Sequence, residues 1–378
     1  MAAPSGPLKG MRIVEFAGIG PAPFCGMLLS DMGADVLRID RKGGGAPLGR
    51  FDVTFRGRRS VALDLKNPAG IAACLDLIAQ ADGLVEGYRP GVMERLGLGP
   101  DVALQRNPKL VYGRMTGWGQ AGSWAKAAGH DINYVAVTGA LHGIGPAEKP
   151  AIPINLVGDY GGGALYLAFG LLAGIIHARA TGEGQVIDAA MTDGTVSLMA
   201  QIYGNHAAGT WRDEREVNII DGGAHFYNVY QCADGEWISV AAMEPAFYAM
   251  LRDKAGLTDP AFDAQMDTAR WPDLKARVAA VFASKTSAEW RALMEGTDVC
   301  FAPVLGLGEA PSHPYHVERG SFVVVDGIVQ PAPAPRFSHT PGQVQGPVPA
   351  AGEHNDEALR DWGFSDAAVA SLRASGAL

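Results

Sequence analysis

The sequence predicts an α/β protein in which a large domain with a doubly wound parallel sheet is joined to a smaller α+β domain. Strand and helix patterns alternate from the N-terminus to about residue 190, which is typical of a parallel sheet with helices on both faces. From about residue 224 the pattern changes to paired strands followed by helices. The 378 residues, of which 48% are hydrophobic, are enough to fill two cores.

The first forty residues predict one strand–helix–strand unit. A helix pattern stands between two strand patterns, over Arg12–Phe16, Phe24–Met32 and Asp35–Asp40. Gly33 ends the helix, and the right-handed crossover between two such strands begins a Rossmann-like sheet. Gly18 and Gly20 in the first loop look like the glycines of a dinucleotide-binding loop. However, Pro21 removes an amide that a pyrophosphate would need and Pro23 replaces the third glycine, so we expect no nicotinamide binding.

Further strands continue the large domain, over Val61–Leu65, Leu84–Glu86, Leu110–Arg114 and Gln185–Ala189. Asn67 and Pro68 form an N-cap and a first helical residue, and they open a helix that runs to Gln80. A helix over Thr192–Ala208 leads out of the domain. We expect the large domain to span residues 1–200 and to be completed by residues 325–378.

A linker over residues 201–223 leads to the smaller domain, residues 224–324. Its two predicted strands are Phe226–Cys232 and Glu236–Ala242, which meet at a hairpin turn with the sequence Asp234-Gly235. Its predicted helices are Ala246–Ala255, Pro272–Ser284 and Ala288–Gly296. A second hairpin is expected over Ser321–Val329, then a Gly/Pro-rich loop over residues 342–351 and a short helix over Asp356–Trp362.

Composition excludes several classes of function. The net charge of −9 argues against general nucleic-acid binding, which needs a positive field. The four cysteines form no C-x-x-C pair and the histidines show no ligand spacing, so we expect neither a metal site nor a disulfide framework. The longest apolar run, Ala164–Ile176, is shorter than the roughly 18 residues of a membrane span and predicts a buried helix with no membrane anchor. Residues 1–9 show no secretory leader, so a cytoplasmic location is expected.

Two segments place ionisable side chains at predicted helix starts, residues 129–134 (GHDINY) and residues 155–163 (NLVGDYGGG). In the first, Gly129 frees the backbone, and His130 and Asp131 open a helix that runs to about Leu141, whose first amides can hold an anion. In the second, Asp159 is the predicted N-cap of a long apolar helix, and the three glycines after it leave room for a ligand. A histidine and an aspartate placed in this way could remove a proton from one face of a carbon atom and return it to the other.

Each of these residues also has a purely structural explanation. Asp is among the commonest N-cap residues, and a histidine at a helix start is often only a surface or capping group. Three glycines in one helical turn destabilise the helix, by about 1 kcal/mol each relative to alanine. Their presence therefore suggests that the backbone closely approaches another group, which favours the functional interpretation.

Positive charge gathers early in the chain, in Arg38, Arg41, Arg56, Arg58, Arg59, Lys66 and Arg89. Arginine and lysine at strand ends suit phosphate groups. The alternative is that these are surface charges paired with neighbouring aspartates such as Asp40, Asp52 and Asp64.

Together these segments resemble the family III CoA-transferase superfamily, also called CaiB/BaiF, and within it the α-methylacyl-CoA racemases. The resemblance runs from about Leu8 to about Phe337, and it includes residues 86–92 (EGYRPGV) and residues 115–120 (MTGWGQ). It implies that His130 and Asp159 are the two catalytic bases and that Glu244, in a Glu-Pro pair, is a third catalytic acid that orients His130. It also implies an acyl-CoA thioester as substrate, no cofactor beyond the CoA moiety, and an interlocked homodimer.

The resemblance further assigns a CoA-binding set, which comprises Arg38, Arg41, Ala62, Leu63, Asp64, Leu65, Lys66, Tyr88, Arg89, Gly129, Ile132 and Asn133. We expect the amide of Asp131 to stabilise an enolate oxygen, with Tyr134, Asn155 and Tyr160 surrounding the bases. Three methionines suit either an acyl-binding surface or core packing, namely Met191, Met199 and Met243.

Three functions remain in competition. The first is a racemase or epimerase that interconverts (R)- and (S)-2-methylacyl-CoA by proton transfer through an enolate. The second is a CoA-transferase in which Asp159 attacks the thioester and forms an anhydride. The third is a non-catalytic CoA-binding protein. His130 favours the first, because a transferase needs only the nucleophile, and the acyl chain is left open.

Overall fold

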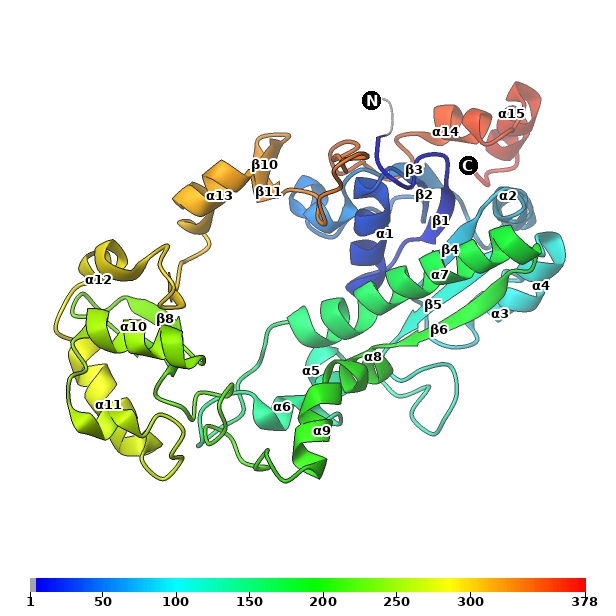
Figure 1. The fold of residues 1–378 in the computed structure, drawn as a ribbon. Coiled ribbons are helices and arrows are strands. Elements are labelled where there is room, and N and C mark those ends of the chain that lie inside the picture. The colour runs from blue at the N-terminus through cyan, green and yellow to red at the C-terminus, as the bar shows by residue number, and fades with distance from the viewer. Residues whose placement is uncertain (1–4) are drawn as a thin grey trace. The chain divides into compact units, whose positions relative to one another are not determined.

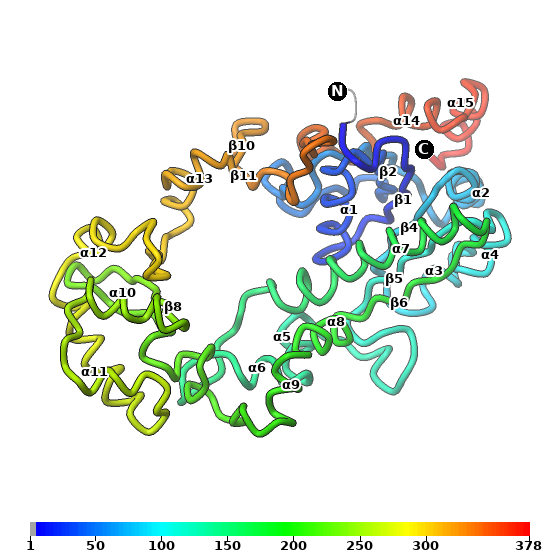
Figure 2. The backbone as a smooth tube through the Cα atoms, in the orientation of Figure 1, coloured from blue at the N-terminus to red at the C-terminus, as the bar shows by residue number. Residues whose placement is uncertain are grey.

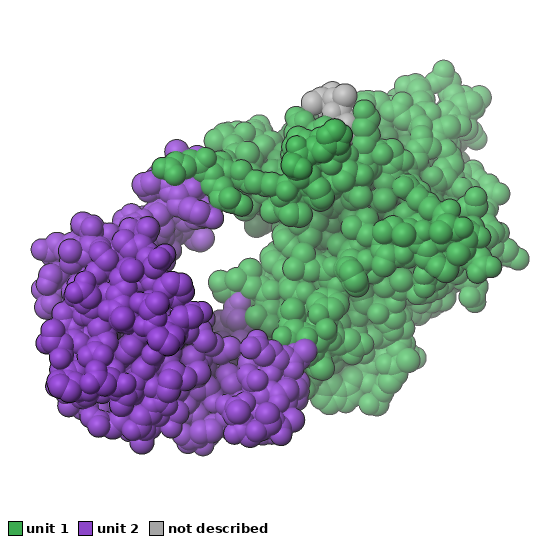
Figure 3. Space-filling view, viewed as in Figure 1, with its two compact units in different colours: residues 1–138, 154–198, 318–378 green, residues 139–153, 199–317 purple. Residues whose placement is uncertain are grey.

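The computed structural model describes residues 5–378, which divide into two compact units (Figure 3). Of the described residues, unit 1 contains 5–138, 154–198 and 318–378, and unit 2 contains 139–153 and 199–317. The chain therefore passes from unit 1 to unit 2 and back twice, as the tube in Figure 2 can be followed to show.

Unit 1 is built on a six-stranded sheet with the order β3-β2-β1-β4-β5-β6, in which every pairing is parallel (Figure 1). The strands are β1 (Arg12–Phe16), β2 (Asp35–Asp40), β3 (Arg59–Ala62), β4 (Gly83–Glu86), β5 (Val111–Thr116) and β6 (Gln185–Ala190). The predicted α/β class with a parallel sheet is confirmed. The strand order reverses between β1 and β4, and such a reversal opens a crevice at the carboxyl edge of the sheet.

Helices cover both faces of this sheet, because successive residues of a strand point to opposite sides. In β1, Ile13 and Val14 are both fully buried, and they belong to different cores. The Ile13 core contains α1 (Pro21–Asp31) and α7 (Leu165–Thr181). The Val14 core contains α2 (Pro68–Ile78), α4 (Pro100–Arg106), α14 (Asn355–Asp361) and α15 (Asp366–Ala374).

The C-terminal segment packs along β3, the edge strand next to β2. The Asn355 side chain accepts a hydrogen bond of 2.8 Å from the amide of Ala62, and the indole of Trp362 donates one of 2.9 Å to Asp35. Arg59 pairs with Asp35 and with Asp361. Figure 2 shows these C-terminal helices in red beside the first strands in blue. The sequence predicted α14 within one residue but missed α15.

The helix predicted from the apolar run Ala164–Ile176 is longer than expected. A π-helical segment, Leu156–Ala164, continues directly into α7. The combined helix has 26 residues, and an 18-residue window within it has a mean hydropathy of 1.5, so the helix is long and apolar enough to cross a membrane by length and composition alone. A core helix passes the same test, and Leu167 and Leu171 are fully buried in the sheet core.

Unit 1 also contains several short elements, among them the hairpin of its C-terminal segment. They are two 3₁₀ turns over Gly49–Phe51 and Val53–Phe55, α3 (Val92–Arg95), α5 (Asp131–Ala136), α8 (Met191–Leu198), β10 (Phe322–Val325) and β11 (Ile328–Pro331). The helix predicted over Thr192–Ala208 is divided, because α8 ends at Leu198 and α9 (Ala200–Ala207) begins unit 2 after Met199.

Unit 2 has a three-stranded antiparallel sheet of β7 (Tyr227–Gln231), β8 (Trp237–Ala241) and β9 (Phe301–Pro303). The predicted hairpin at Asp234-Gly235 joins the first two strands. The helices are α6 (Ala140–Gly143), α10 (Pro245–Ala255), α11 (Trp271–Phe282) and α12 (Ser287–Met294), with 3₁₀ turns over Pro260–Asp263 and Ala310–Ser312, and α13 (Pro314–Arg319) runs across the boundary. Buried aromatic side chains such as Trp271, Phe282 and Trp290 fill its core.

Candidate active site

A cavity of about 520 Å³ opens in unit 1 at the carboxyl edge of the sheet, where the strand order reverses. The loop after β1, residues 87–90 after β4 and residues 115–118 at the end of β5 line it. His130 and Asp159 also line the cavity. This is the place where open α/β sheets bind ligands, and it brings the two predicted bases into one cavity.

His130 is the N-cap residue of α5, and its side chain is exposed. The Oδ1 of Asn133 accepts a hydrogen bond of 3.0 Å from the His130 amide, which closes the helix start. The prediction that this helix continues to Leu141 is wrong. It ends at Ala136, and Gly139 with a φ of 79° separates it from α6, so the helix dipole acts through about one turn only.

Tyr134 fixes the loop that carries His130. Its hydroxyl donates a hydrogen bond to the carbonyl of Gly129, and Trp118 meets its ring edge-on at 4.8 Å. A Cβ at Gly129 would stand 2.7 Å from the Tyr134 ring, and one at Gly117 would overlap that ring. The glycine of the first motif therefore makes room for Tyr134, and does not serve to free the backbone as the sequence suggested.

Asp159 lies inside the π-helical segment and is not its N-cap, which corrects the prediction. The N-cap is Asn155, whose side chain hydrogen-bonds to the Asp159 carboxyl. Burial raises the pKa of Asp159, and the charge of Asp131 raises it further, against the opposing effects of Asn155 and His130. Because π-helical turns are frequent at functional sites, the irregular helix agrees with a role for Asp159 in the cavity.

The glycines after Asp159 serve close packing, which corrects the expectation that they leave room for a ligand. A Cβ at Gly162 would stand 2.5 Å from Oγ1 of Thr195, and one at Gly163 would stand 2.9 Å from the Met191 side chain. Both contacts are with α8. Met191 itself lines the cavity.

Tyr160 and Gly20 connect the Asp159 helix with the start of α1. The Tyr160 ring stacks on Phe24 with a centroid distance of 4.2 Å. A Cβ at Gly20, which has a φ of 68°, would stand 3.3 Å from Oδ2 of Asp159. This role of Gly20 was not predicted from the sequence. A glycine between a strand and a helix that begins with proline is the signal that could have found it.

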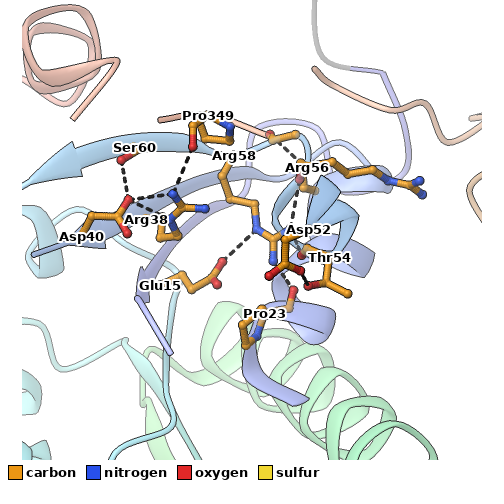
Figure 4. Close-up of polar contacts among 12 residues, drawn as sticks. Glu15, Pro23, Arg38, Asp40, Asp52, Thr54, Arg56, Arg58, Ser60 and Pro349 are labelled. Atoms are coloured by element: carbon orange, nitrogen blue, oxygen red, sulfur yellow. Dashed lines mark hydrogen bonds and ion pairs between the residues drawn. The ribbon is translucent and has the colours of Figure 1, made fainter. Parts of the chain in front are cut away.

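Arg38 does not reach the cavity, so its predicted contact with CoA is wrong. Its side chain is fully buried and pairs with Asp40 at 2.8 Å (Figure 4). Its guanidinium also lies over the Phe55 ring. Two neighbouring arginines are also held by buried acids. Arg58 pairs with Glu15 (Figure 4), and Arg56 pairs with Asp31. These three arginines are structural. The alternative of surface charges paired with Asp40, Asp52 and Asp64 agrees with the structure only in the Arg38–Asp40 pair, because the three arginines are buried and the other two pair with Asp31 and Glu15.

The exposed cations of the predicted CoA-binding set follow three successive strand ends. Arg41 follows β2, Lys66 lies beyond β3 and Arg89 follows β4. Arg89 and the half-buried Tyr88 line the cavity. The carboxyl ends of parallel strands lie at one edge, so the cations that can meet phosphate gather on the side where the cavity opens.

Residues 62–64 are less available to CoA than predicted. The amides of Ala62, Leu63 and Asp64 bond to Asn355, to the carbonyl of Asp40 and to the carbonyl of Ala377 respectively. Leu63 is also fully buried. These amides are therefore already hydrogen-bonded within unit 1, whereas Leu65 is only half-buried and Lys66 is exposed.

The other predicted site residues are divided between the two units. Gly129 and Asn133 line the cavity, while Ile132 is half-buried beside it. Glu244 is the N-cap of α10 in unit 2, and its contact with His130 stays a prediction. In the described part of the chain, no group of three His, Cys, Asp or Glu side chains is arranged to hold a metal ion.

The chain was compared with known proteins. The family described as CoA-transferase family III matches residues 8–355. The chain belongs to this family. Two family III relatives are the α-methylacyl-CoA racemases of Mus musculus and Homo sapiens. The first is 45% identical over 97% of this chain and 96% of its own length, and the second is 44% identical over 95% and 94%.

A solved structure of similar fold is Rv3272 from Mycobacterium tuberculosis. It aligns with a TM-score of 0.78 and 29% identity over 93% of this chain and 99% of that one. A CaiB/BaiF family protein from Brucella suis, at 23% identity and a TM-score of 0.81, shares the fold.

Proposed function

We propose that this member of family III is an α-methylacyl-CoA racemase, which interconverts (R)- and (S)-2-methylacyl-CoA by moving the α-proton. The observation that carries the proposal is that His130 and Asp159, from two separate motifs, line one cavity. The mouse and human relatives that are named as this enzyme match nearly the whole chain and support it.

The reaction needs two groups that exchange a proton with opposite faces of one carbon atom. In one direction His130 removes the α-proton and Asp159 returns one to the opposite face, and the roles are exchanged in the reverse direction. Burial raises the pKa of Asp159, which suits a carboxyl that must hold a proton for part of the cycle. Glu244 would fix the imidazole of His130 in one tautomer.

The enolate oxygen needs a preorganised donor, because the α-proton of a thioester is a weak acid. The amide of Asp131 in the first turn of α5 is the proposed donor, and such a donor is worth about 3 kcal/mol in related sites. The proposal requires no cofactor beyond the CoA moiety of the substrate.

The CoA phosphates would bind the three exposed cations at the strand ends, Arg41, Lys66 and Arg89. These residues follow β2, β3 and β4, and Tyr88 would lie beside the adenosine. The acyl chain would extend over the apolar part of the cavity, where Met191 and Trp118 are found.

The assembly that this proposal includes is an interlocked homodimer, in the cytoplasm and without a membrane anchor. Apolar side chains on the outer face of α7, namely Leu165, Phe169 and Ile176, are more than half exposed, and a second subunit would cover them. The strand β6 is a sheet edge, and Val186 on it is also exposed. The division into a large domain of residues 1–200 with 325–378 and a smaller one of residues 224–324 is part of the same proposal.

The alternative function is a CoA-transferase in which Asp159 attacks the thioester carbonyl. The CoA thiolate would leave and then attack the aspartyl carbonyl of the resulting anhydride, which releases the first acid and leaves an aspartyl-CoA thioester. The second acid would attack this thioester and obtain the CoA by the same two steps in reverse, which restores the Asp159 carboxylate. This alternative requires no role for His130. The exposed position of His130 in the cavity therefore favours the racemase.

The first test is to incubate the protein with (R)-2-methylacyl-CoA in deuterated water, with chiral separation and mass spectrometry of the thioester. A racemase introduces one deuterium at the α-carbon and brings the two epimers to similar amounts. If the α-proton is retained while added free acids acquire CoA, the transferase alternative is correct.

The two bases are then tested by substitution. His130→Ala and Asp159→Ala should each abolish racemisation, and exchange from one face alone should persist in each variant. His206→Ala, an exposed histidine of α9, is the matched control and should retain full activity. Full racemisation by both site variants would exclude the proposed pair.

A further inference from the structure

We propose that the carboxylate of Asp131 is a positioning group for Asp159, which anchors the Asp159 backbone and sets the balance between proton removal and proton return at that residue. The kinetic part of this inference rests on the proposed function. The proposed donor to the enolate oxygen is the backbone amide of Asp131, and the Asp131 side chain is a separate feature of the site.

The anchor is a hydrogen bond between the two motifs. The amide of Asp159 donates a hydrogen bond of 2.6 Å to Oδ1 of Asp131, which belongs to α5 and is 9% exposed. The first bond of the π-helical pattern runs from the amide of Tyr160 to the carbonyl of Asn155. The Asp159 amide therefore belongs to the orphan donors of a helix start, and Asp131 supplies the acceptor that the helix lacks.

Gly158 adapts the chain to this carboxylate. A Cβ at Gly158 would overlap Oδ1 of Asp131 and would stand 3.0 Å from a methyl group of Val135. The glycine therefore allows the carboxylate to lie against the backbone just before Asp159. The contact is built from both sides, by a buried acid in one motif and by a missing side chain in the other.

The negative charge of the Asp131 carboxylate also acts on Asp159. Oδ2 is buried and has no hydrogen-bond partner in the described part of the chain, so the negative charge is not neutralised by an adjacent donor. A negative charge close to Asp159 favours the protonated form of Asp159. The pKa of Asp159 is raised first by burial and then by this charge.

Other groups that face Asp159 come from three elements. From α5 they are Asp131, His130 and Tyr134, of which His130 acts in the opposite sense. The start of α1 contributes Gly20 and Pro21, and α8 contributes the neutral side chains of Met191 and Thr195 against the same helix. Asp131 is thus the source of negative charge among these groups.

Two substitutions separate the anchor from the charge. Asp131→Asn retains a carbonyl oxygen that can accept the Asp159 amide, but it removes the charge. Asp131→Ala removes both. Asp193→Asn, which neutralises an exposed carboxylate in the first turn of α8, is the matched control.

The test that does not depend on activity is a ¹³C NMR titration of protein labelled at the aspartate carboxyl carbons. The resonance that is lost in Asp159→Asn identifies Asp159. We expect it to titrate above the ordinary range of an aspartate in the unmodified protein and to move downward in Asp131→Asn, but not in Asp193→Asn. A titration of Asp159 that is the same with and without Asp131 overturns the proposal, even if the protein is a transferase.

Kinetics then test the anchor in the racemase. Asp131→Asn should lower kcat/KM by about tenfold, because a weaker base abstracts the proton more slowly, and it should move the pH profile of kcat/KM toward lower pH. The loss is the same in both directions, since the equilibrium constant of the racemisation is fixed by the two epimers. Asp131→Ala, which also lacks the anchor, should lower kcat/KM further. A loss of activity in Asp131→Asn with an unshifted pH profile would indicate a merely structural residue. If neither variant folds, the titration of the unmodified protein decides, and an Asp159 resonance in the ordinary aspartate range overturns the proposal.

Discussion

Gly20 lies directly against the carboxylate of Asp159. A Cβ at Gly20 would stand 3.3 Å from Oδ2 and 3.7 Å from the carboxyl carbon of Asp159, and Gly20 has a φ of 68° and a ψ of −120°. Only glycine adopts this backbone conformation without strain. The N-terminus of α1 therefore approaches the proposed base as closely as a backbone can.

Gly20→Ala should reduce activity more than it reduces stability. The backbone strain costs about 1 kcal/mol or more, and the new methyl group pushes on the Asp159 carboxylate, so we expect kcat/KM to fall by about tenfold. Racemisation rates and urea unfolding of the same preparations measure the two effects.

Gly18→Ala is the control in the same loop. Gly18 has no positive φ, and a Cβ there would meet only the carbonyl oxygen of Phe16 at 3.9 Å. This variant should retain activity within about twofold. Equal activity of the Gly20 and Gly18 variants would refute the importance of the Gly20 contact.

Gly194→Ala should destabilise unit 1 strongly. A Cβ at Gly194 in α8 would overlap the carbonyl oxygen of Gly162 in the Asp159 helix, and backbone atoms cannot move away as a flexible side chain can. We expect the free energy of unfolding to fall by about 3 kcal/mol, the upper end of ordinary overpacking. Gly204→Ala in α9, where a Cβ meets nothing within 4 Å, should leave stability unchanged or raise it by about 1 kcal/mol. Chemical denaturation compares the two, and a Gly194 variant as stable as the Gly204 variant would contradict the packing.

The arginines should separate into a binding class and a structural class. Arg41→Ala should weaken CoA binding by about tenfold and reduce its salt dependence, because an exposed phosphate contact is lost. Arg38→Met should instead cost about 3 to 5 kcal/mol of stability, since Asp40 would be left buried without its partner. Calorimetric titration with CoA and urea unfolding measure the two effects.

Arg106→Ala serves as the control for both. Arg106 is an exposed residue of α4 that pairs with Asp76, and it precedes β5, so it lies at the opposite edge of the sheet from the cavity. Its substitution should change neither quantity. Unaltered CoA affinity in Arg41→Ala would place the phosphates elsewhere.

The sheet of unit 1 could be predicted from the sequence because its signals are local. The bounds of β1 and β2 agree with the prediction residue for residue, since each is a short strand pattern that begins just after a glycine-containing turn. The π-helical segment could not be predicted in this way. Asp159 before three glycines matches an N-cap pattern, and only the packing of Gly162 on Thr195 explains why the helix begins earlier, after Asn155.

The site was predicted as a set of motifs but not in its details. The meeting of His130 and Asp159 in one cavity follows from tertiary structure, and the sequence suggested it through the resemblance of two motifs. The burial of Arg38 against Asp40 depends on the C-terminal segment, where the carbonyl of Pro349 lies 3.4 Å from the guanidinium. A contact across 311 positions leaves no local pattern, so exposed and buried arginines look alike in the sequence.

His225 should make the stability of unit 2 dependent on pH. The side chain is fully buried, and burial lowers its pKa from 6.5 to about 4. The Tyr248 hydroxyl donates to the carbonyl of Phe262 at 2.9 Å, so the Nε2 of His225, 2.7 Å from that hydroxyl, is the donor to Tyr248. The Nδ1 of His225 is then unprotonated, and it has no hydrogen-bond partner among the described residues. A second proton on this ring would have no acceptor.

The pH range of the effect follows from the two pKa values. Above pH 6.5 the imidazole is neutral in both the folded and the unfolded protein, and it contributes no pH dependence. Between pH 6.5 and about pH 4 the unfolded chain binds a proton that the folded protein does not, so the free energy of unfolding falls as the pH is lowered. His225→Gln can still donate to Tyr248 and cannot titrate, so its stability should fall less over this range than that of the unmodified protein. His339→Gln, at an exposed position, should retain the full decrease. Urea unfolding at several pH values measures how the free energy of unfolding changes with pH. Equal pH dependence in all three proteins would show that protonation of His225 does not destabilise unit 2.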